Sequence, residues 1–276
     1  MTVIAMNREI GSLGTDVATE VAKQLDLKII HSEIVANQIA ERMGIEESAV
    51  QRYVDGSASI VERWLINRRK LSRYTSEEIL SLAQQGNVLI RGWGAATLLR
   101  DMPQVISVRV CAPMDFRVEI MMEKMGIKDP NAVRQEIERF DAAHTRVMRG
   151  SFNVEREDPL LYHLVLNSER LPVDACVKAI CEMARHSRFQ DHTTTQSVLS
   201  NKLLEAKINS ALGDEIGSSM APTGVTVSVD NGKVTLVATS SSGRLRARAE
   251  KVAARIAGVY AIDNRIISVP SHGSRS

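Results

Sequence analysis

The sequence predicts an α/β protein, with a parallel sheet flanked by helices, followed by a small α+β domain. Two observations lead to this division. Up to residue 187, short apolar runs alternate with amphipathic helical patterns, as in parallel sheets covered on both faces. From residue 198 the order becomes helix, strand, strand, helix, strand (αββαβ). The stretch RFQDHTTTQS (188–197) between the two patterns is polar and aperiodic, so we interpret it as a linker.

The composition is that of a globular protein with aliphatic cores. The 276 residues are enough for two domains, and 44% of them are apolar while only 4% are aromatic. A net charge of +2 is too small to indicate nucleic-acid binding. Cys111, Cys176 and Cys181 have neither metal-ligand nor disulfide spacing and are interpreted as reduced thiols. We find neither a signal peptide nor an apolar stretch of the roughly 18–20 residues that span a bilayer. We therefore expect a cytoplasmic protein that is not integral to a membrane.

The elements of the first domain, residues 1–187, follow from apolar periodicity. TVIAM and LKII flank the helical run DVATEVAKQLDL, which predicts a parallel strand–helix–strand unit at the start of the chain. Strands are predicted at residues 2–6, 27–30, 87–95, 105–113 and 162–168. Helices are predicted at residues 16–27, 32–45, 46–54, 59–71, 76–86, 114–126, 130–150 and 172–187. Ser76 and Gly86 are the expected N-cap and terminator of the helix between them.

The second domain, residues 198–270, begins with an amphipathic helix at 198–213. GVTVSVDNGKVTLVATS (224–240) alternates on both sides of Asn231-Gly232, which is a strong hairpin signal. A helix at 243–259 and a strand at 261–269 complete the order, and residues 271–276 form a tail. One face of the second helix is basic: Arg244, Arg248, Lys251 and Arg255. This face either meets an anionic lipid or an acidic protein partner, or is a solvated surface.

A glycine loop, NREIGSLGTD (7–16), lies between the first strand and the first helix. Backbone N–H groups in such a loop and the N-terminus of the following helix bind phosphate. A Walker loop requires G-x-x-x-x-G-K-[ST], and this stretch has no lysine, although Arg8 would supply a positive charge. The loop is therefore either a phosphate site or only a turn. The candidate phosphate-binding residues are Gly11, Ser12, Leu13, Gly14, Thr15 and Asp16.

The same stretch resembles the opening of the cytidylate-kinase-like family, a divergent branch of the P-loop nucleoside monophosphate kinases. That family typically opens I-T-I-S-R-E-x-G-S-G-G-x-E-I-A and tends to lack the Walker lysine. The matching positions are Arg8, Glu9, Gly11, Ser12 and Gly14, and Leu13 stands where a glycine is usual. The resemblance implies a P-loop NTPase-type sheet, ATP and Mg²⁺ as cofactors, and a nucleotide as partner.

Two downstream stretches are similar to the same family. The first, residues 87–119, resembles a strand, a G-R-G-A turn, a second strand and A-P-x-x-x-R-x-E, with Trp93 in place of the turn arginine. Its matches are Gly92, Gly94, Ala95, Ala112, Pro113 and Arg117, and Arg91 lies two residues before Trp93. The second, RFDAAHTRVMRGSF (139–152), resembles the lid helix, with a match at Asp141 and with His144 where an arginine is usual.

The resemblance and the positions in the chain assign roles to individual residues. The catalytic candidates are Arg8, Arg139, Arg146 and Arg149, which would neutralise the transferred phosphate. The substrate-binding candidates are His31, Glu33, Arg91 and Arg117, and the magnesium candidate is Asp16. Structural alternatives stay open. In these alternatives, Arg8 pairs with Glu9 or Asp16, and Ser32 is a helix N-cap with Glu33 in the first turn. Asp16 is then a first-turn acid stabilised by the helix dipole, and the lid arginines form a solvated face.

The C-terminal residues 197–270 resemble a BON domain, with N-G-x-V-x-L at Asn231–Leu236 and G-V-x-x-[VI]-x-N at Gly258–Asn264. Ala238 stands where a glycine is usual. The resemblance implies binding to phospholipid surfaces or to other proteins. Three functions follow from the whole sequence. The first is ATP-dependent phosphoryl transfer to a nucleoside monophosphate such as CMP. The second is nucleotide binding without turnover, and the third is an interaction protein that acts through the C-terminal domain.

Overall fold

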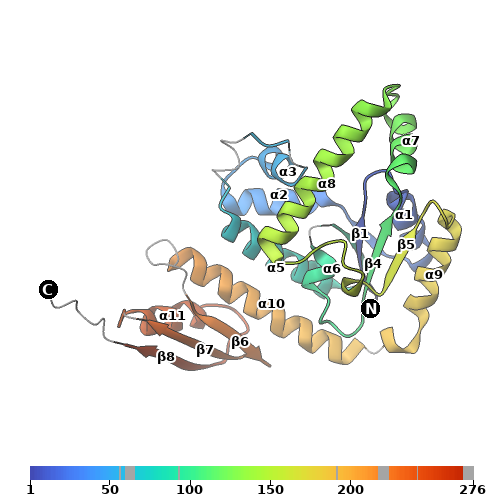
Figure 1. Ribbon diagram of the computed structural model, residues 1–276. Helices are drawn as coiled ribbons and strands as arrows, with labels where there is room; N and C mark the ends of the chain where they lie inside the picture. The colour runs from blue at the N-terminus through green and yellow to red at the C-terminus, as the bar shows by residue number, and fades with distance from the viewer. Residues whose placement is uncertain are drawn as a thin grey trace. The chain divides into compact units, whose positions relative to one another are not determined.

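The computed structural model describes residues 1–55, 57–59, 66–92, 94–190, 192–216, 224–240 and 242–269 (Figure 1). The chain divides into two compact units, Met1–Thr195 and Gln196–Ser276. The first unit contains a five-stranded sheet and the second a three-stranded sheet. The α/β class with a smaller α+β part, predicted from the order of the elements, is therefore confirmed.

The sheet of the first unit has the strand order β2-β3-β1-β4-β5, and each described pairing in it is parallel. Its strands are β1 Val3–Arg8, β2 Lys28–Ile30, β3 Val88–Arg91, β4 Val105–Cys111 and β5 Leu164–Asn167. β1 lies in the centre, with Val3 opposite both Val88 and Val105. Val3 to Met6 are buried because a central parallel strand is covered on both faces. β1 ends at Arg8, so Arg8 and Arg91 both stand at the carboxyl edge of the sheet.

Helices cover both faces of this sheet. They are α1 Gly14–Leu25, α2 Ser32–Met43, α3 Glu47–Asp55, α5 Arg68–Gln85, α6 Ala95–Leu98, α7 Met114–Met125, α8 Pro130–Phe152 and α9 Val173–Arg185. Two short 3₁₀ turns, Pro159–Leu161 and Ser187–Phe189, lie beside β5 and after α9. α1 and α9 contact each other over β1 and β4, whereas α5 and α6 contact β3 and β1. α8 contacts α3, α5 and α7.

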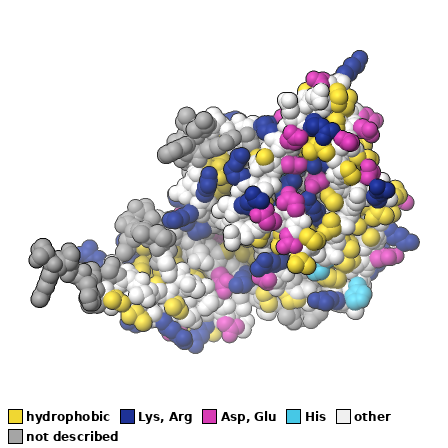
Figure 2. All heavy atoms as spheres, viewed as in Figure 1, with side chains coloured by type: hydrophobic (Ala, Val, Ile, Leu, Met, Phe, Trp, Pro, Cys, Tyr) yellow, Lys and Arg dark blue, Asp and Glu magenta, His cyan; other side chains and the backbone are white. Residues whose placement is uncertain are grey.

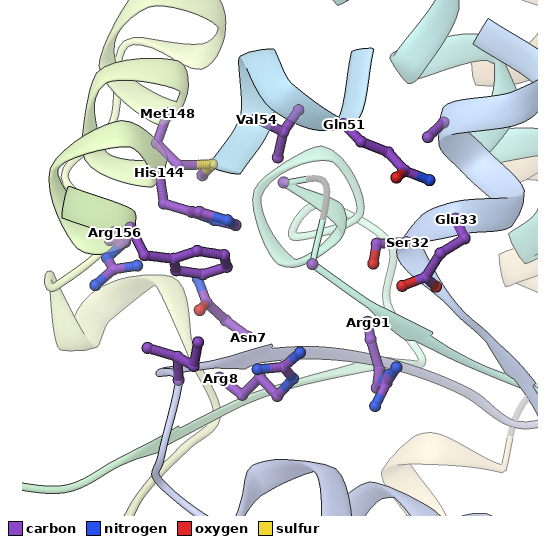
Figure 3. A pocket seen from close by; sticks show the side chains of 15 residues that line it. Asn7, Arg8, Ser32, Glu33, Gln51, Val54, Arg91, His144, Met148 and Arg156 are labelled. Atoms are coloured by element: carbon purple, nitrogen blue, oxygen red, sulfur yellow. The ribbon is translucent and has the colours of Figure 1, made fainter. Parts of the chain in front are cut away.

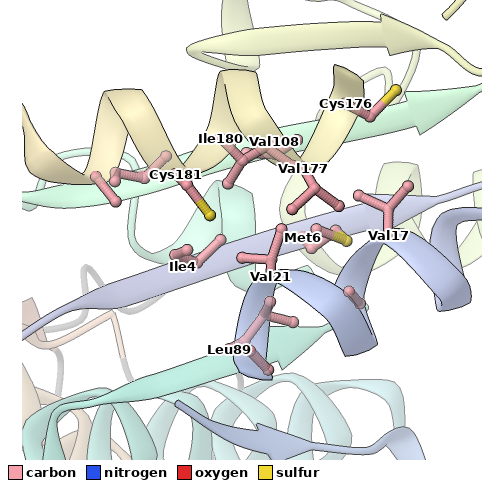
Figure 4. Packing of buried hydrophobic residues seen from close by; sticks show 14 of the residues in the cluster. Ile4, Met6, Val17, Val21, Leu89, Val108, Cys176, Val177, Ile180 and Cys181 are labelled. Atoms are coloured by element: carbon pink, nitrogen blue, oxygen red, sulfur yellow. The ribbon is translucent and has the colours of Figure 1, made fainter. Parts of the chain in front are cut away.

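An aliphatic core joins α1, α9 and the sheet (Figure 4). Val17 and Val21 of α1 and Ile180 of α9 point at Ile4 and Met6 of β1, and all five side chains are at most 1% exposed. Cys176 and Cys181 are buried in the same cluster, while Cys111 is half-buried, and all three are free thiols. This core fixes the start of α1 against the end of β1, and it therefore fixes the glycine loop between them.

The structure differs from the sequence predictions in the middle of the first unit. α5 runs without a break from Arg68, and Asn67 is its N-cap. Ser76 is not an N-cap, because its hydroxyl donates to the carbonyl of Ser72 inside the helix. Gly86 ends the helix as predicted, with φ of +71°. Most of the helix expected at 59–71, and also Trp93, lie outside the described residues.

The second unit has the predicted αββαβ order. Its elements are most of α10 (His192–Glu215), β6 Thr226–Asp230, β7 Lys233–Ser240, α11 Leu245–Ala254 and β8 Ala261–Ser268. β6 pairs antiparallel and β8 parallel with β7. Asn231 and Gly232 both have positive φ, as a two-residue hairpin turn requires. α10 begins at His192, inside the stretch 188–197 that we interpreted as an irregular linker.

Charged side chains of both signs are interspersed over the visible surface (Figure 2). In the described part of the chain, we find no helix with the length and apolar character that a membrane span requires.

Candidate functional site

The glycine loop forms a tight connection from β1 to α1. Gly11 and Leu13 have φ of +79° and +54°, and the Ser12 hydroxyl donates to the carbonyl of Glu9 at 2.7 Å. Ser12 N–H also donates to that carbonyl, at 3.2 Å. Within the described residues no acceptor faces the other backbone N–H groups of the loop and of the first turn: Gly11, Leu13, Gly14, Thr15 and Asp16. Free amides at a helix N-terminus fit a phosphate group.

Gly14 stands where the lysine of a Walker loop would be, and packing closes this position. A Cβ on Gly14 would lie 2.7 Å from Cβ of Arg8 and 3.3 Å from Cβ of Val110. These atoms belong to the central strands β1 and β4, which cannot shift without disturbing the sheet. Any side chain at position 14 would therefore collide with the sheet. In this conformation of the loop, position 14 therefore has no room for the side chain of a lysine.

A buried network of ion pairs supports the loop from behind. Arg109, Arg117 and Arg156 are 5%, 4% and 3% exposed. Arg109 Nη2 lies 2.6 Å from Glu9 Oε1, Arg117 Nη1 lies 2.8 Å from Asp141 Oδ2, and Arg156 Nη2 lies 2.9 Å from Asp141 Oδ1. Arg156 Nε also binds Glu157 Oε1 at 2.7 Å, and Arg117 Nη1 lies 3.6 Å from Glu9 Oε2. Three arginines thus meet three carboxylates, and the network has no net charge.

This network fixes the first residues of the loop. Glu9 Oε2 accepts from the N–H of Ala112 at 3.2 Å, and Arg117 Nε donates to the carbonyl of Ile10 at 2.8 Å. A Cβ on Gly11 would lie 2.6 Å from the carbonyl oxygen of Arg117, so the loop packs directly on the start of α7. Burial acts to raise the pKa of Asp141, but hydrogen bonds and charges from Arg117 and Arg156 outweigh it and lower that pKa.

A cavity of about 290 Å³ opens beside the loop, at the carboxyl ends of β1 and β3 (Figure 3). Its polar lining comes from Asn7, Arg8, Ser32, Glu33, Gln51, Arg91, His144 and Arg156. Its apolar lining comes from Ile10, Ala36, Val54, Phe140 and Met148, with Gly92 and Gly94 at the turn after β3. The rings of Phe140 and His144 stack with centroids 4.4 Å apart. Ligands of parallel α/β sheets bind at this edge of the sheet.

Arg8 and Arg91 give the cavity its positive end (Figure 3). In the described part of the chain neither has a carboxylate within ion-pair distance, although Arg91 Nη2 lies 2.7 Å from His31 Nδ1. Because a guanidinium can only donate, His31 Nδ1 is the acceptor there. Nε of Arg91 is buried without a hydrogen-bond partner. Burial and the neighbouring charge of Arg91 lower the pKa of Arg8, while Glu33 acts to raise it. Two such cations fit an anionic ligand.

The predicted site residues are only partly brought together. Arg8, Glu33 and Arg91 line the cavity, and His31 contacts Arg91. Arg117 does not line it, because its guanidinium is used by Glu9 and Asp141. Asp16 is an exposed first-turn residue whose carboxylate lies 3.1 Å from Lys124 Nζ. Among the residues described, no group of three or more His, Cys, Asp or Glu side chains could hold a metal.

The lid arginines lie on other faces of α8 than the cavity. The cavity is lined by Phe140, His144 and Met148, which are spaced by one helical turn. Arg139 pairs with Glu136 and Arg149 pairs with Glu155, and both are exposed. Arg146 is exposed as well. The structure therefore does not place Arg139, Arg146 or Arg149 at the cavity, and their catalytic role stays a prediction.

Several lining residues were not predicted from the sequence. Asn7 was inside the quoted loop, but its contact with Tyr162 joins segments 155 residues apart. Arg156 lies in the segment after α8, and no motif in the sequence includes it. Gln51 belongs to the helical run 46–54, where only the i, i+4 pair with Glu47 could have drawn attention. These residues reach the cavity through tertiary folding, which local patterns do not report.

The basic face of α11 is partly neutralised within the second unit. Arg248 donates to the carbonyl of Glu215 at 2.7 Å, and Arg255 Nη1 lies 3.3 Å from a carboxylate oxygen of Glu215. Arg244 and Lys251 are exposed. Binding of an anionic lipid or an acidic protein at this face stays a prediction.

The sheet order, the free amides of the glycine loop and the cationic cavity define an α/β protein of the kinase-like P-loop class. The chain belongs to the cytidylate kinase-like family, whose model matches residues 3–170, more than half of its length. Residues 200–270 match the BON domain. Both resemblances seen in the sequence are thereby confirmed.

Curated proteins named cytidylate kinase are similar to the first unit at low identity. A cytidylate kinase from Pyrobaculum islandicum is 25% identical over 182 residues, which are 64% of this chain and 90% of the relative. One from Methanocaldococcus jannaschii is 24% identical over 166 residues, 59% of this chain and 86% of the relative. A crystal structure of an uncharacterised protein from Eubacterium ventriosum has a TM-score of 0.51 and 19% identity, covering 66% of this chain and 96% of that protein. This last similarity bears on the fold alone.

Proposed function

We propose that the first unit transfers a phosphoryl group from ATP to a nucleoside monophosphate. The observation that carries the proposal is the pairing of two features at one edge of the sheet. One is a loop whose backbone amides have no acceptor among the described residues. The other is the adjacent cavity, which contains two arginines, Arg8 and Arg91, without carboxylate partners there. The loop suits the donor phosphates and the cavity suits the acceptor.

The chain's own residues divide the work between binding and charge neutralisation. The amides of Gly11 to Asp16 would hold the donor phosphates, and Arg91 would hold the acceptor phosphate. Arg8 stands between the loop and the cavity and would stabilise the charge on the transferred group. Mg²⁺ takes one or two carboxylates and otherwise phosphate oxygens and water, so Asp16 would be its single carboxylate ligand if it exchanged Lys124 for the metal. When bound, Mg²⁺ supplies neutralisation of the donor phosphates.

The reaction requires no covalent intermediate. An oxygen of the acceptor phosphate forms a bond to the γ-phosphorus while the bond between that phosphorus and the β,γ-bridging oxygen breaks, and ADP leaves. Positive charge around the three equatorial oxygens is therefore the main requirement. For Arg139 or Arg149 to contribute, each would exchange its glutamate partner for the nucleotide. The named relatives are cytidylate kinases, which supports CMP as the acceptor.

The test is a calorimetric titration of the full chain with ATP·Mg²⁺, with and without CMP, followed by a product assay on the same samples. We expect ATP and CMP to bind and ADP and CDP to form. In Arg8→Met we expect a large loss of nucleotide binding and of product formation. The proposal would be rejected if neither ATP nor CMP bound at millimolar concentration.

A second candidate function, nucleotide binding without turnover, is supported by α8. His144 faces the cavity where the family usually has an arginine, and Arg139 and Arg149 pair with glutamates away from it. The product assay separates the two functions. Binding of ATP and CMP that gives no ADP under multiple-turnover and single-turnover conditions would select the second.

A further inference from the structure

Gln51 of α3 presents a fixed oxygen to the cavity. Its Nε2 donates to Glu47 Oε1 at 2.6 Å, one helical turn earlier. A carboxylate only accepts hydrogen bonds, so the amide NH₂ must be the group that faces Glu47. Oε1 is then left for the cavity, and Figure 3 shows the oxygen of Gln51 on the side of the cavity and the nitrogen farther from it. Glu47 therefore turns Gln51 into a hydrogen-bond acceptor.

Gln51 lies at the end of the cavity opposite the two arginines, where the base of a bound nucleotide would lie. Arg8 and Arg91 lie at the strand end of the cavity, whereas Gln51 and Val54 approach from α3 on the opposite side (Figure 3). Between the two ends, Phe140, His144 and Met148 of α8 supply an aromatic and apolar wall, in which the rings of Phe140 and His144 stack. A nucleotide with its phosphate on the arginines would direct its base toward α3. A flat base suits such a wall.

We propose that Gln51 is the residue that selects the base of the acceptor, and that it does so by accepting a hydrogen bond from an exocyclic amino group. This inference rests on the proposed function, since it takes the cavity as the nucleoside monophosphate site. Cytosine presents an amino group where uracil presents a carbonyl oxygen. Uracil would place its oxygen against Oε1 of Gln51 and leave two acceptors unsatisfied, which is costly in an enclosed site. The selected acceptor is therefore an aminopyrimidine nucleotide.

Adenine also carries an exocyclic amino group, and the size of the cavity favours the smaller cytosine. The cavity of about 290 Å³ is at the lower end of the range for ligand pockets. The smaller pyrimidine ring is the better occupant. AMP and its oxo counterpart IMP provide a second matched pair, in which the same amino-to-carbonyl exchange is made on a purine.

The experiment measures calorimetric affinities of the full chain for CMP, UMP, AMP and IMP, in the wild type and in three variants. Gln51→Met removes the amide and keeps the length of the side chain. Glu47→Gln keeps Gln51 but removes the carboxylate that orients it, so the amide can turn either its oxygen or its NH₂ to the base. Glu46→Gln is the matched control, because it removes the same charge one residue away. The carboxylate of Glu46 contacts Ser48 and not Gln51.

We expect the wild type to bind CMP about ten- to a hundredfold more tightly than UMP, the effect of one unsatisfied buried pair. Gln51→Met should bring this ratio close to one. Glu47→Gln should lower it through tighter binding of UMP, a result that a merely structural role of Gln51 would not give. Glu46→Gln should leave the ratio unchanged. A preference for AMP over CMP would overturn the pyrimidine assignment.

Two failures are distinguishable. If the wild type binds the monophosphates but neither Gln51→Met nor Glu47→Gln changes the ratio of CMP to UMP affinity, Gln51 does not read the base and the proposed function stands. If none of the four monophosphates binds to the wild type, the cavity is not an acceptor site, and both proposals fall. Thermal unfolding of each variant confirms that the compared proteins are folded.

Discussion

Two sets of arginines lie near the carboxyl end of the parallel sheet, and the fold uses them differently. Arg109, Arg117 and Arg156 are almost fully buried, and each is paired with a carboxylate. Arg8 and Arg91 border the cavity, and neither is paired with a carboxylate of the described residues. The first set stabilises the positions of the loop and α8. The second set has no direct carboxylate partner among the described residues, although Glu33 is an internal counter-charge to Arg8. An anionic ligand would relieve the repulsion between Arg8 and Arg91. Each prediction below tests one side of this comparison.

The largest effect is expected from the paired set. Asp141→Asn removes the carboxylate shared by Arg117 and Arg156 and leaves two buried cations uncompensated. Breaking a buried pair from one side costs about 3–5 kcal/mol, so we expect a loss of this size in the free energy of unfolding, measured by urea denaturation. Asp115→Asn, which breaks the exposed pair with Arg134, is the control and should cost less than about 1 kcal/mol. Equal losses in the two variants would contradict the distinction.

The stabilisation by Asp141 should depend on pH in one direction. Its pKa in the folded protein is lowered from the ordinary value of 3.8, after burial is outweighed by Arg117 and Arg156. A group of this kind stabilises fully above the unfolded-state pKa and loses its contribution as the pH falls through the folded-state pKa. The difference in unfolding free energy between wild type and Asp141→Asn should be constant near neutral pH. It should shrink once the pH falls below the ordinary aspartate pKa of 3.8. If this difference grew on acidification, the pKa of Asp141 would be raised by folding and not lowered.

For the unpaired set, we expect a loss of binding without a loss of stability. Arg8→Met removes a charge-assisted contact to phosphate worth about 1.5–3 kcal/mol, roughly a ten- to hundredfold weaker affinity for CMP or ATP. It also removes repulsion with Arg91, so the melting temperature should stay equal or rise. Arg100→Met, on an exposed arginine beside Asp101, should change neither quantity. A destabilised Arg8→Met protein would mean that Arg8 has a structural partner after all.

Restoring the Walker lysine should fail. Gly14→Lys places a Cβ 2.7 Å from Cβ of Arg8, and overpacking of this kind costs about 1–3 kcal/mol. We expect lower thermal stability and weaker ATP binding than in the wild type. The control is Gly150→Lys, a helical glycine whose added Cβ would meet nothing within 4 Å. Tighter ATP binding in Gly14→Lys would show that the loop can open to admit a lysine.

The smallest effect is expected at Leu13, which adopts the left-handed region with φ of 54° and ψ of 10°. This conformation costs a branched residue roughly 1–2 kcal/mol, and glycine avoids that cost but loses some of the gain to unfolded-state entropy. Leu13→Gly should therefore stabilise by about 0.5–1 kcal/mol in urea denaturation. Asn153→Gly, at φ of 53°, should gain less because asparagine tolerates the same region. A destabilised Leu13→Gly variant would indicate that the Leu13 side chain makes compensating contacts.

The sequence predicted most of the elements because their signals are local. Apolar runs such as TVIAM indicate buried strands, and Asn231-Gly232 predicts a hairpin through the positive φ that its turn requires. The boundaries that failed had misleading local signals. Ser76 has the residue type of an N-cap, but α5 continues through it from Asn67. The threonines at 193–195 suggest a linker, but they lie inside α10, which begins at His192.

The candidate site was predicted in its position but only partly in its membership. The glycine loop and the residues Arg8, Glu33 and Arg91 could be found because they follow strands whose carboxyl ends share one edge. Arg117, Arg139 and Arg149 could not be judged from the sequence, because an arginine looks the same whether it is paired or free. Their partners are set by packing, and Gln51 reaches the cavity only because α3 packs on α8.

By itself, the sequence determined the α/β class, the order of the second domain, the loop and the family, since periodicity, turn chemistry and motif spacing act over a few residues. The tertiary structure decided which arginines are neutralised and which remain available. Glu9 and Arg109, 100 residues apart in the chain, are joined at 2.6 Å, while Arg8, next to Glu9, has no such partner among the described residues. Ion pairing is a short-range interaction in space, and only the folded chain sets which charges come within its range.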